Sequence, residues 1–130
     1  MPKLTEECLF CNKKKQNITY STKFIYIVRD SYPVTKYHTL IIPHRHVSNF
    51  FDLNQGELKD LSKVLKKERQ SLLNLDKKIT AFNVGVNAGK DAGQSVMHCH
   101  IHLIPRRKGD IENPKGGVRG VIPSKQKYIK

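Results

Sequence analysis

Apolar and polar positions in the first third of the chain follow the short period of β-strands. Residues 17–20 and 24–29 are rich in β-branched and aromatic side chains, and the segment 21–23 between them predicts a β-hairpin. Residues 38–42 form another apolar run, which we expect to stop at Pro43 because proline cannot donate to a sheet ladder. The first third of the chain is therefore predicted to be rich in strands.

The next segment changes to a helical period. Asn54 and Glu57 have the spacing of an N-cap and its N3 partner, a variant of the capping box with Asn in place of Ser or Thr. Beyond them, apolar residues fall mainly on one helical face and basic residues on the other. The apolar set is Leu58, Leu61, Val64, Leu65 and Leu72, and the basic set is Lys63, Lys66, Lys67 and Arg69. We expect this helix to end near residues 73–76.

Strand character returns after the helix. Residues 79–86 predict a strand, residues 87–94 a turn that contains glycine, and residues 96–104 a last strand that ends at Pro105. Glycine and proline then predict an irregular segment that lies on the domain. The order of elements indicates an α+β fold.

Size and hydropathy are those of one soluble domain. The chain has 130 residues and 38% apolar content, and no stretch approaches the ~20 apolar residues of a membrane span. The first fifteen residues carry charges around no long apolar region, so we expect no signal peptide and predict a cytoplasmic protein.

Positive charge is in large excess. The chain has 24 Lys and Arg against 11 Asp and Glu, a net charge of +13, and such a field attracts phosphates, free or polymeric. From residue 106 onward, eight basic residues accompany Asp110 and Glu112. They are Arg106, Arg107, Lys108, Lys115, Arg119, Lys125, Lys127 and Lys130. We interpret this tail as a source of phosphate contacts, with a merely solubilising tail as the alternative.

Three histidines alternate in the last predicted strand. His98, His100 and His102 would share one face, while Cys99, Ile101 and Leu103 would enter the core from the other. Buried imidazoles are costly without partners, so we expect this row to have a chemical role. One metal ion is a poor common partner because the rings are ~6.6–6.8 Å apart along an extended strand. A neutral imidazole can instead attack phosphorus and form a labile N–P bond, which favours nucleophilic catalysis by His100.

The run from Gly93 to Arg106, GQSVMHCHIHLIPR, closely resembles the signature of the histidine triad (HIT) family, His-φ-His-φ-His-φ-φ with φ apolar. The resemblance extends over residues 24–30, 33–46, the helix and residues 82–89, but not over the last twenty residues. It implies a HIT-like fold, a five-stranded antiparallel sheet with one main helix, and a homodimer. We predict a HIT domain over residues 1–105, with an N-terminal zinc-binding segment, and a basic tail packed on it over residues 106–130.

The resemblance also implies roles for individual residues. His100 would attack the α-phosphorus and form a nucleotidyl-histidine, with its ring oriented by the His98 carbonyl, while His102 would contact a phosphate oxygen. The surrounding residues would be Gln94 and Ser95 near the leaving group, Asn87 at the phosphate, Asp30 at the ribose hydroxyls and His38 as a support of the triad.

A Cys-x-x-Cys pair precedes the first strand. In a cytoplasmic chain, Cys8 and Cys11 indicate a metal site or a redox pair. The pair resembles that of zinc-binding HIT proteins, which implies a structural zinc held by Cys8, Cys11, His46 and His98, with His44 as a competing ligand. A closed set of two cysteines and two histidines suits structural zinc.

The motif and the charge together predict a hydrolase of dinucleoside polyphosphates, which releases a mononucleotide and could need a divalent cation with its substrate. Arg106 and the other basic residues of the tail fit a long anionic substrate. The alternatives are an adenosine phosphoramidate hydrolase or nucleotidyl transferase of the same family, a zinc-stabilised nucleic-acid-binding module, and a catalytically silent family member.

Overall fold

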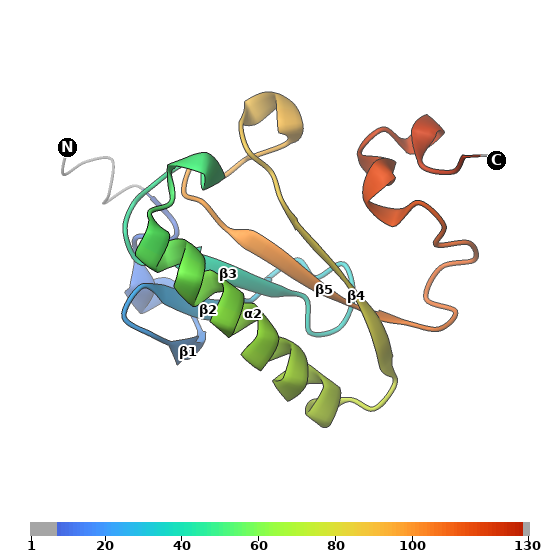
Figure 1. Cartoon of the computed structure of the whole chain (residues 1–130), viewed down its shortest axis with the longest axis horizontal. Coiled ribbons are helices and arrows are strands. Elements are labelled where there is room, and N and C mark those ends of the chain that lie inside the picture. Colours follow the sequence, from blue (N-terminus) through green and yellow to red (C-terminus); the bar gives the residue numbers. More distant parts are fainter. Residues whose placement is uncertain (1–7, 129–130) are drawn as a thin grey trace.

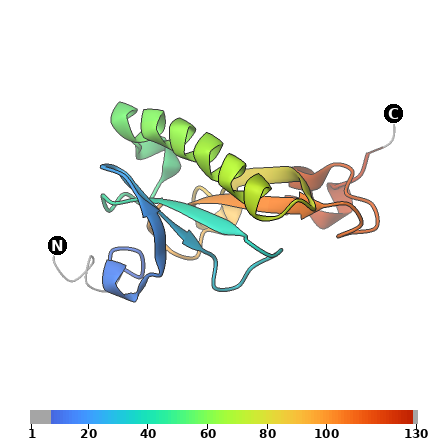
Figure 2. The ribbon, with the colours of Figure 1, turned by 90° about the horizontal axis from the view of Figure 1, so that it is seen from below.

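The computed structural model describes residues 8–128 and contains one antiparallel sheet covered by one long helix (Figure 1). The strands are β1 (Ile18–Ser21), β2 (Ile25–Arg29), β3 (Thr39–Pro43), β4 (Ile79–Val86) and β5 (Ile101–Arg107), in the spatial order β1-β2-β3-β5-β4. Helix α2 (Gln55–Leu75) crosses one face of this sheet (Figure 2). The predicted five-stranded antiparallel sheet with one main helix is confirmed.

Short 3₁₀ helices lie in the connections and in the C-terminal segment. They are η1 (Lys13–Lys15), η2 (Phe50–Asp52), η3 (Lys90–Ala92), η4 (Gly117–Val121) and η5 (Pro123–Lys125). η3 lies within the predicted turn 87–94, where Gly89 and Gly93 have positive φ angles of 102° and 98°. Within residues 8–128, no helix combines the length and the apolar character that crossing a membrane requires.

Helix α2 begins with the predicted capping box. The Asn54 side chain accepts the Glu57 N–H at 2.8 Å, and the Glu57 carboxylate accepts the Asn54 N–H at 2.9 Å. Glu57 is only 2% exposed, and its charge is paired with Arg45 at 2.8 Å. Two otherwise unpaired N–H groups at the helix start are thus satisfied by a buried carboxylate and its cap.

The core lies between the sheet and α2. Cys99, Ile101 and Leu103 pack in the same cluster as Leu61 and Val64 of the helix, so the predicted apolar face of the histidine run is confirmed. The opposite face of the sheet carries a smaller apolar cluster of Phe10, Tyr26, Val28, Leu40 and Ile42. The histidines lie on this opposite, helix-free side.

The predicted bounds of the last strand are wrong at its start. Continuing the β3–β5 register from Ile41 opposite Ile101 would set Cys99 opposite Pro43, which has no N–H for the ladder. The Cys99 N–H instead donates to the Val47 carbonyl at 2.7 Å. Residues 96–100 therefore follow the loop after β3 rather than forming a strand.

The predicted end at Pro105 is also wrong, because β5 continues to Arg107. Pro105 pairs with Phe82 of β4, while its carbonyl accepts the Thr35 hydroxyl at 2.6 Å on the other side. In an antiparallel strand, the N–H and carbonyl of one residue point to the same side, so the N–H that Pro105 lacks would face the β3 side. The last β3–β5 pair is Thr39 with Leu103, so β3 offers no partner at Pro105. No hydrogen bond to β4 is lost, so proline is tolerated there.

Candidate active site and metal centre

The His100 ring is held in one tautomer by the backbone. Its Nδ1 donates to the His98 carbonyl at 2.8 Å, which leaves the lone pair on Nε2. The ring is 9% exposed and lies against Phe10, with 5.0 Å between the ring centroids. In the neutral ring of His100, the Nε2 lone pair therefore lies on the side away from the carbonyl that orients the ring.

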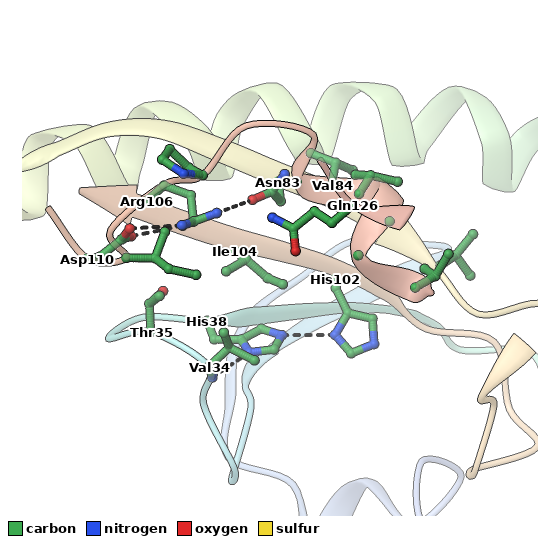
Figure 3. A pocket seen from close by; sticks show the side chains of 18 of the residues that line it. Val34, Thr35, His38, Asn83, Val84, His102, Ile104, Arg106, Asp110 and Gln126 are labelled. Carbon is green, nitrogen blue, oxygen red and sulfur yellow. Dashed lines mark hydrogen bonds and ion pairs between the residues drawn. The ribbon is translucent and has the colours of Figure 1, made fainter. Parts of the chain in front are cut away.

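The His102 ring is fixed by a chain of hydrogen bonds that starts at the backbone. The Val34 N–H donates to Nδ1 of His38 at 3.0 Å, so the His38 proton is on Nε2. This Nε2 donates to Nδ1 of His102 at 2.9 Å (Figure 3). His102 must then carry its proton on Nε2, and it can donate that N–H to an acceptor.

Burial favours the neutral form of both rings in this hydrogen-bond chain, His38 and His102. Desolvation lowers the pKa of His102 to about 4, helped by its neighbours His100 and His38. Burial also lowers the pKa of His38, and the Asp30 carboxylate, 3.5 Å from its Nε2, only partly opposes this. Asp30 uses its other oxygen to accept the Tyr32 N–H at 2.9 Å. Since both His38 nitrogens already have hydrogen-bond partners, we interpret this cluster as a hydrogen-bond chain rather than a metal site.

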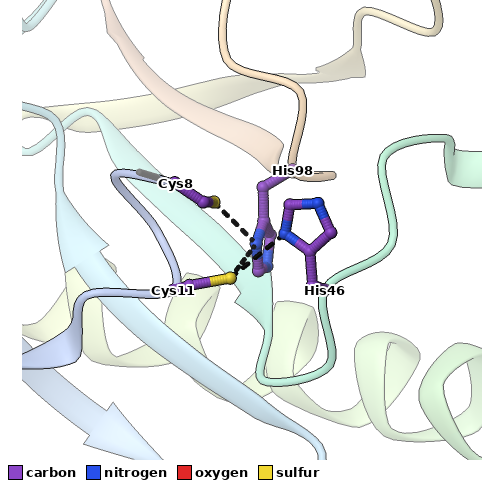
Figure 4. A group of neighbouring side chains, drawn as sticks. All are labelled: Cys8, Cys11, His46 and His98. Carbon is purple, nitrogen blue, oxygen red and sulfur yellow. Dashed lines mark hydrogen bonds between the residues drawn. The ribbon is translucent and has the colours of Figure 1, made fainter. Parts of the chain in front are cut away.

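A second cluster joins the N-terminal segment to the histidine run (Figure 4). The ligand atoms of Cys8, Cys11, His46 and His98 all lie within 4.8 Å of one another. Cys8 Sγ is 3.3 Å from Nδ1 of His98, and Cys11 Sγ is 3.1 Å from Nδ1 of His46. These residues could hold one tetrahedral zinc ion, since two thiolates and two imidazoles are its preferred donors.

The orientation of His98 agrees with this use. Its Nε2 donates to the Pro43 carbonyl at 2.8 Å, so its Nδ1 lone pair faces the two cysteines. Burial lowers the pKa of His98 to about 4, and burial together with Cys8 raises the pKa of the Cys11 thiol to about 11. A bound cation would favour the Cys11 thiolate and so lower the pKa of this thiol again.

His44, the competing ligand, lies elsewhere. Its Nε2 contacts the Thr22 carbonyl at 3.0 Å and the Ser21 hydroxyl at 3.1 Å, both in the β1–β2 hairpin. The structure therefore brings His46, and not His44, to the cysteines.

The other predicted site residues, Asn87, Ser95 and Gln94, differ in whether their side chains are available to a substrate. Asn87 lines the same cleft as His102, and Ser95 is exposed. The Gln94 amide is used within the fold: it accepts the Gly89 N–H at 2.8 Å and donates to the Ser48 carbonyl at 2.7 Å. Gln94 thus holds the turn that precedes the triad.

Arg106 is engaged by other side chains. Two of its guanidinium nitrogens donate to Asp110 at 2.8 Å each, and a third donates to Asn83 at 2.7 Å. Arg106 therefore adds no net positive charge to the cleft, because the Asp110 carboxylate neutralises its guanidinium group.

The cleft that contains His102 has a volume of about 610 Å³. Its lining includes His38, His102 and Asn87, and also Arg106 and Asp110. Residues 110–126 of the C-terminal segment form one of its walls.

Three features of this site were missed from the sequence. The Val34 N–H sets the His38 tautomer, but a backbone donor leaves no side-chain pattern. Phe10 covers His100 from between the two cysteines, where an apolar residue suggests only packing. Asp110 neutralises Arg106, and the four-residue spacing of opposite charges was the available signal.

Comparison with known proteins identifies relatives of this chain. The family model described as the HIT domain matches residues 12–109. The nitrilase and fragile histidine triad fusion protein NitFhit of Caenorhabditis elegans is 41% identical over 100 residues, which are 77% of this chain and 22% of that protein. The bis(5'-nucleosyl)-tetraphosphatase (asymmetrical) of Schizosaccharomyces pombe is 38% identical over 94 residues, which are 72% of this chain and 51% of that protein. The chain thus spans a fifth to a half of the length of these two relatives.

Solved structures share the fold. A Zn-bound histidine triad family protein from Mycobacterium smegmatis has a TM-score of 0.74 and 27% identity, over 82% of this chain and 79% of that one. The diadenosine triphosphate hydrolase of Plasmodium falciparum, in complex with Cyclomarin A, has a TM-score of 0.69 and 30% identity, over 76% of this chain and 67% of that one. Since the family model covers most of its length and the fold agrees, this chain belongs to the HIT family.

Proposed function

We propose that this protein is a nucleotide hydrolase in which His100 attacks the α-phosphorus of its substrate. The observation that carries the proposal is the hydrogen bond from Nδ1 of His100 to the His98 carbonyl, because it leaves the Nε2 lone pair available. In the first step, Nε2 forms a bond to phosphorus and the bond from phosphorus to the leaving group breaks. The leaving group takes up a proton from solvent. Water then attacks phosphorus, the N–P bond breaks, the mononucleotide is released and the proton of the attacking water returns to solvent.

The neighbouring residues would stabilise this reaction. The Nε2–H of His102 would donate to a phosphate oxygen as charge develops on it, and His38 would hold His102 in the required tautomer. Asn87 would contact phosphate, Asp30 the ribose hydroxyls and Ser95 the leaving group. Gln94 would act indirectly through the turn 87–94, because its amide is bound to backbone groups.

Dinucleoside polyphosphates are the substrates we favour. Two relatives support this choice by name, the S. pombe tetraphosphatase and the P. falciparum diadenosine triphosphate hydrolase. Adenosine phosphoramidates, or transfer of the nucleotide to another acceptor, are the alternatives with the same first step. The predicted contact of Arg106 with substrate would require the guanidinium to exchange Asp110 for phosphate. A divalent cation bound with the substrate stays a prediction.

We also propose a structural zinc at Cys8, Cys11, His46 and His98. The closeness of the four donor atoms supports it, as does the Zn-bound M. smegmatis relative. When bound, the ion would tie the N-terminal segment to the loop that carries His98, and so to the carbonyl that orients His100. The closed donor set gives it no open position for catalysis.

We propose that the enzyme is cytoplasmic and assembles as a homodimer. Strand β4 is at the edge of the described sheet, so one side of its backbone has no neighbouring strand within that sheet. A second copy that pairs along this edge would satisfy the outward N–H and C=O groups of β4. Light scattering on the purified chain would distinguish a dimer from a monomer. In this proposal, residues 1–105 are the HIT domain and residues 106–130 are a tail packed on it.

The decisive experiment compares the wild type with His100→Ala on a panel of dinucleoside polyphosphates and adenosine phosphoramidates. We expect turnover by the wild type and a loss of at least about 10³-fold in kcat for the variant, since a nucleophile is removed. His44→Gln is the matched control, because it changes a histidine outside the site. Equal turnover by wild type and His100→Ala would contradict the mechanism. If neither turned over any compound while the wild type bound nucleic acid with a strong salt dependence, the non-catalytic binding module would replace it.

A further inference from the structure

We infer that the tail cleft binds the leaving half of the substrate and selects an uncharged planar group, such as a second nucleoside, over a further run of phosphates. The tail cleft is the 610 Å³ space between the segment that contains Val34 and Thr35, the β4–β5 ribbon, and residues 110–126. The inference deepens the proposed function and rests on attack at the α-phosphorus.

The tail cleft is continuous with the triad. His102, Ile104 and Arg106 all line it from the same face of β5, with Ile104 between the other two (Figure 3). The path along the strand from His102 to Arg106 is about 13 Å, long enough for a nucleoside attached to phosphate at His102. Asp30, which we propose for the ribose of the transferred nucleotide, is not part of the lining. The tail cleft is therefore available for the other half of the substrate.

The lining is suited to a neutral group. Its walls carry apolar side chains, and its polar side chains include the amides of Asn83 and Gln126. The lining residues with a fixed charge are Arg106 and Asp110, which neutralise each other in one ion pair. A chain of phosphates lying along this surface would lose water without gaining a free cation.

Two basic residues of the tail, Lys115 and Arg119, do not supply the tail cleft with a free cation. Lys115 and Arg119 do not line the tail cleft; they lie over the Tyr128 ring, 5.1 Å and 4.9 Å from its centre. The charges of these two residues, which are among those that suggested a longer anionic substrate, are thus directed elsewhere.

The tail wall has a defined conformation. Gly116 has a φ of 82°, and a Cβ at this position would be 1.9 Å from the Gln126 carbonyl oxygen, so only glycine fits. The loop is closed by Arg119, whose Nε donates to that carbonyl at 3.2 Å. These contacts hold Val118 and Val121 in the wall of the tail cleft.

Apolar side chains on opposite sides of the tail cleft are open to solvent. Val34 is 71% exposed, and Val118 and Val121 are 63% and 76% exposed. A base or another planar group between these walls would cover them, and the volume is within the usual ~300–1,000 Å³ of ligand pockets.

The kinetic test compares Val121→Asp with Ile122→Asp. Ile122 is a matched control because it is also exposed, at 57%, but does not line the tail cleft. Diadenosine triphosphate carries a second nucleoside, whereas the leaving group of adenosine 5'-phosphoramidate is only ammonia. We expect Val121→Asp to raise KM for the dinucleotide about tenfold and to leave the phosphoramidate unaffected, while Ile122→Asp changes neither. An unchanged dinucleotide KM, or an equal rise for both substrates, would overturn the inference.

A binding test separates this inference from the proposed chemistry. The full-length His100→Ala protein is titrated with diadenosine triphosphate or with AMP, and methyl NMR signals are followed. The Val118 and Val121 methyls should shift with the dinucleotide and not with AMP, and the Ile122 methyl should stay in place. The same shifts with AMP, or none, would contradict the inference whether or not His100 is the nucleophile. Shifts that depend on protein concentration alone would assign the tail cleft to a second copy of the chain and also overturn it.

Discussion

His38 and His102 are joined directly through their rings, with Nε2 of His38 2.9 Å from Nδ1 of His102. Because Nδ1 of His38 already accepts the Val34 N–H, the direction of this bond is determined. A backbone amide in the β2–β3 loop thereby decides which nitrogen of His102 carries the proton. His38 can therefore control the His102 N–H that is proposed to contact the substrate, although His38 itself need not touch the substrate.

Replacing His38 with alanine should therefore impair catalysis more than binding. Without its partner, the His102 ring can rotate and can carry its proton on Nδ1, so kcat should fall about 10- to 100-fold with a smaller change in KM. Steady-state kinetics measures both values, and circular dichroism checks that the variant folds. A variant with the kcat of the wild type would show that the bond does not position His102.

Stability should decrease as the pH falls from 7 to 5. The pKa of His102 is about 4 in the folded chain, below its ordinary value of 6.5, so between these values the unfolded chain binds more protons. Protonation thus favours unfolding, and the stability of the folded chain declines as the pH falls below 6.5. Urea titrations at both pH values measure the free energy of unfolding.

The contribution of His102 is isolated by the variant His102→Asn. Its stability should differ less between pH 7 and pH 5 than that of the wild type, at equal zinc content. Ser71→Ala, an exposed change on the helix, should keep the full difference. An identical pH dependence in His102→Asn and the wild type would assign the effect to other groups, such as His98.

Removal of one cysteine ligand should abolish zinc binding. We expect the wild type to be purified with about one zinc per chain and Cys11→Ser with almost none, because a structural site needs all four donors. Cys99→Ala is the control, since Cys99 is a buried thiol outside the cluster. Elemental analysis measures the metal, and thermal unfolding should show a lower Tm for Cys11→Ser. Equal zinc in both variants would refute the proposed ligand set.

Glu57 should be important for stability. Glu57→Ala removes the acceptor for the Asn54 N–H and the partner of Arg45, and should lower the free energy of unfolding by about 1–3 kcal/mol. The exposed Glu112 provides the comparison, and Glu112→Ala should stay within about 0.5 kcal/mol of the wild type. Denaturant titrations measure both. Similar small effects for the two variants would mean that the capping box contributes little.

The sequence by itself determined the features that depend on neighbours along the chain. The alternation of residues 98–103 predicted which side chains enter the core, and the Asn54–Glu57 spacing predicted the start of α2. Both predictions are correct because strand and helix periods, and the contacts of a helix cap, are set within a few residues. The histidine run also indicated the family, since its residue types and spacing are contained in one short segment.

Only the tertiary structure decided the features that depend on partners distant in sequence. Pro105 stays within β5 because β3 has already ended beside it, and Cys99 leaves the ladder because Pro43 stands opposite. Likewise His46 rather than His44 lies beside the cysteines, and Asp110 forms an ion pair with Arg106. Hydrogen bonds, charge pairing and clefts require atoms a few ångströms apart. Local patterns cannot show which distant segments will supply them.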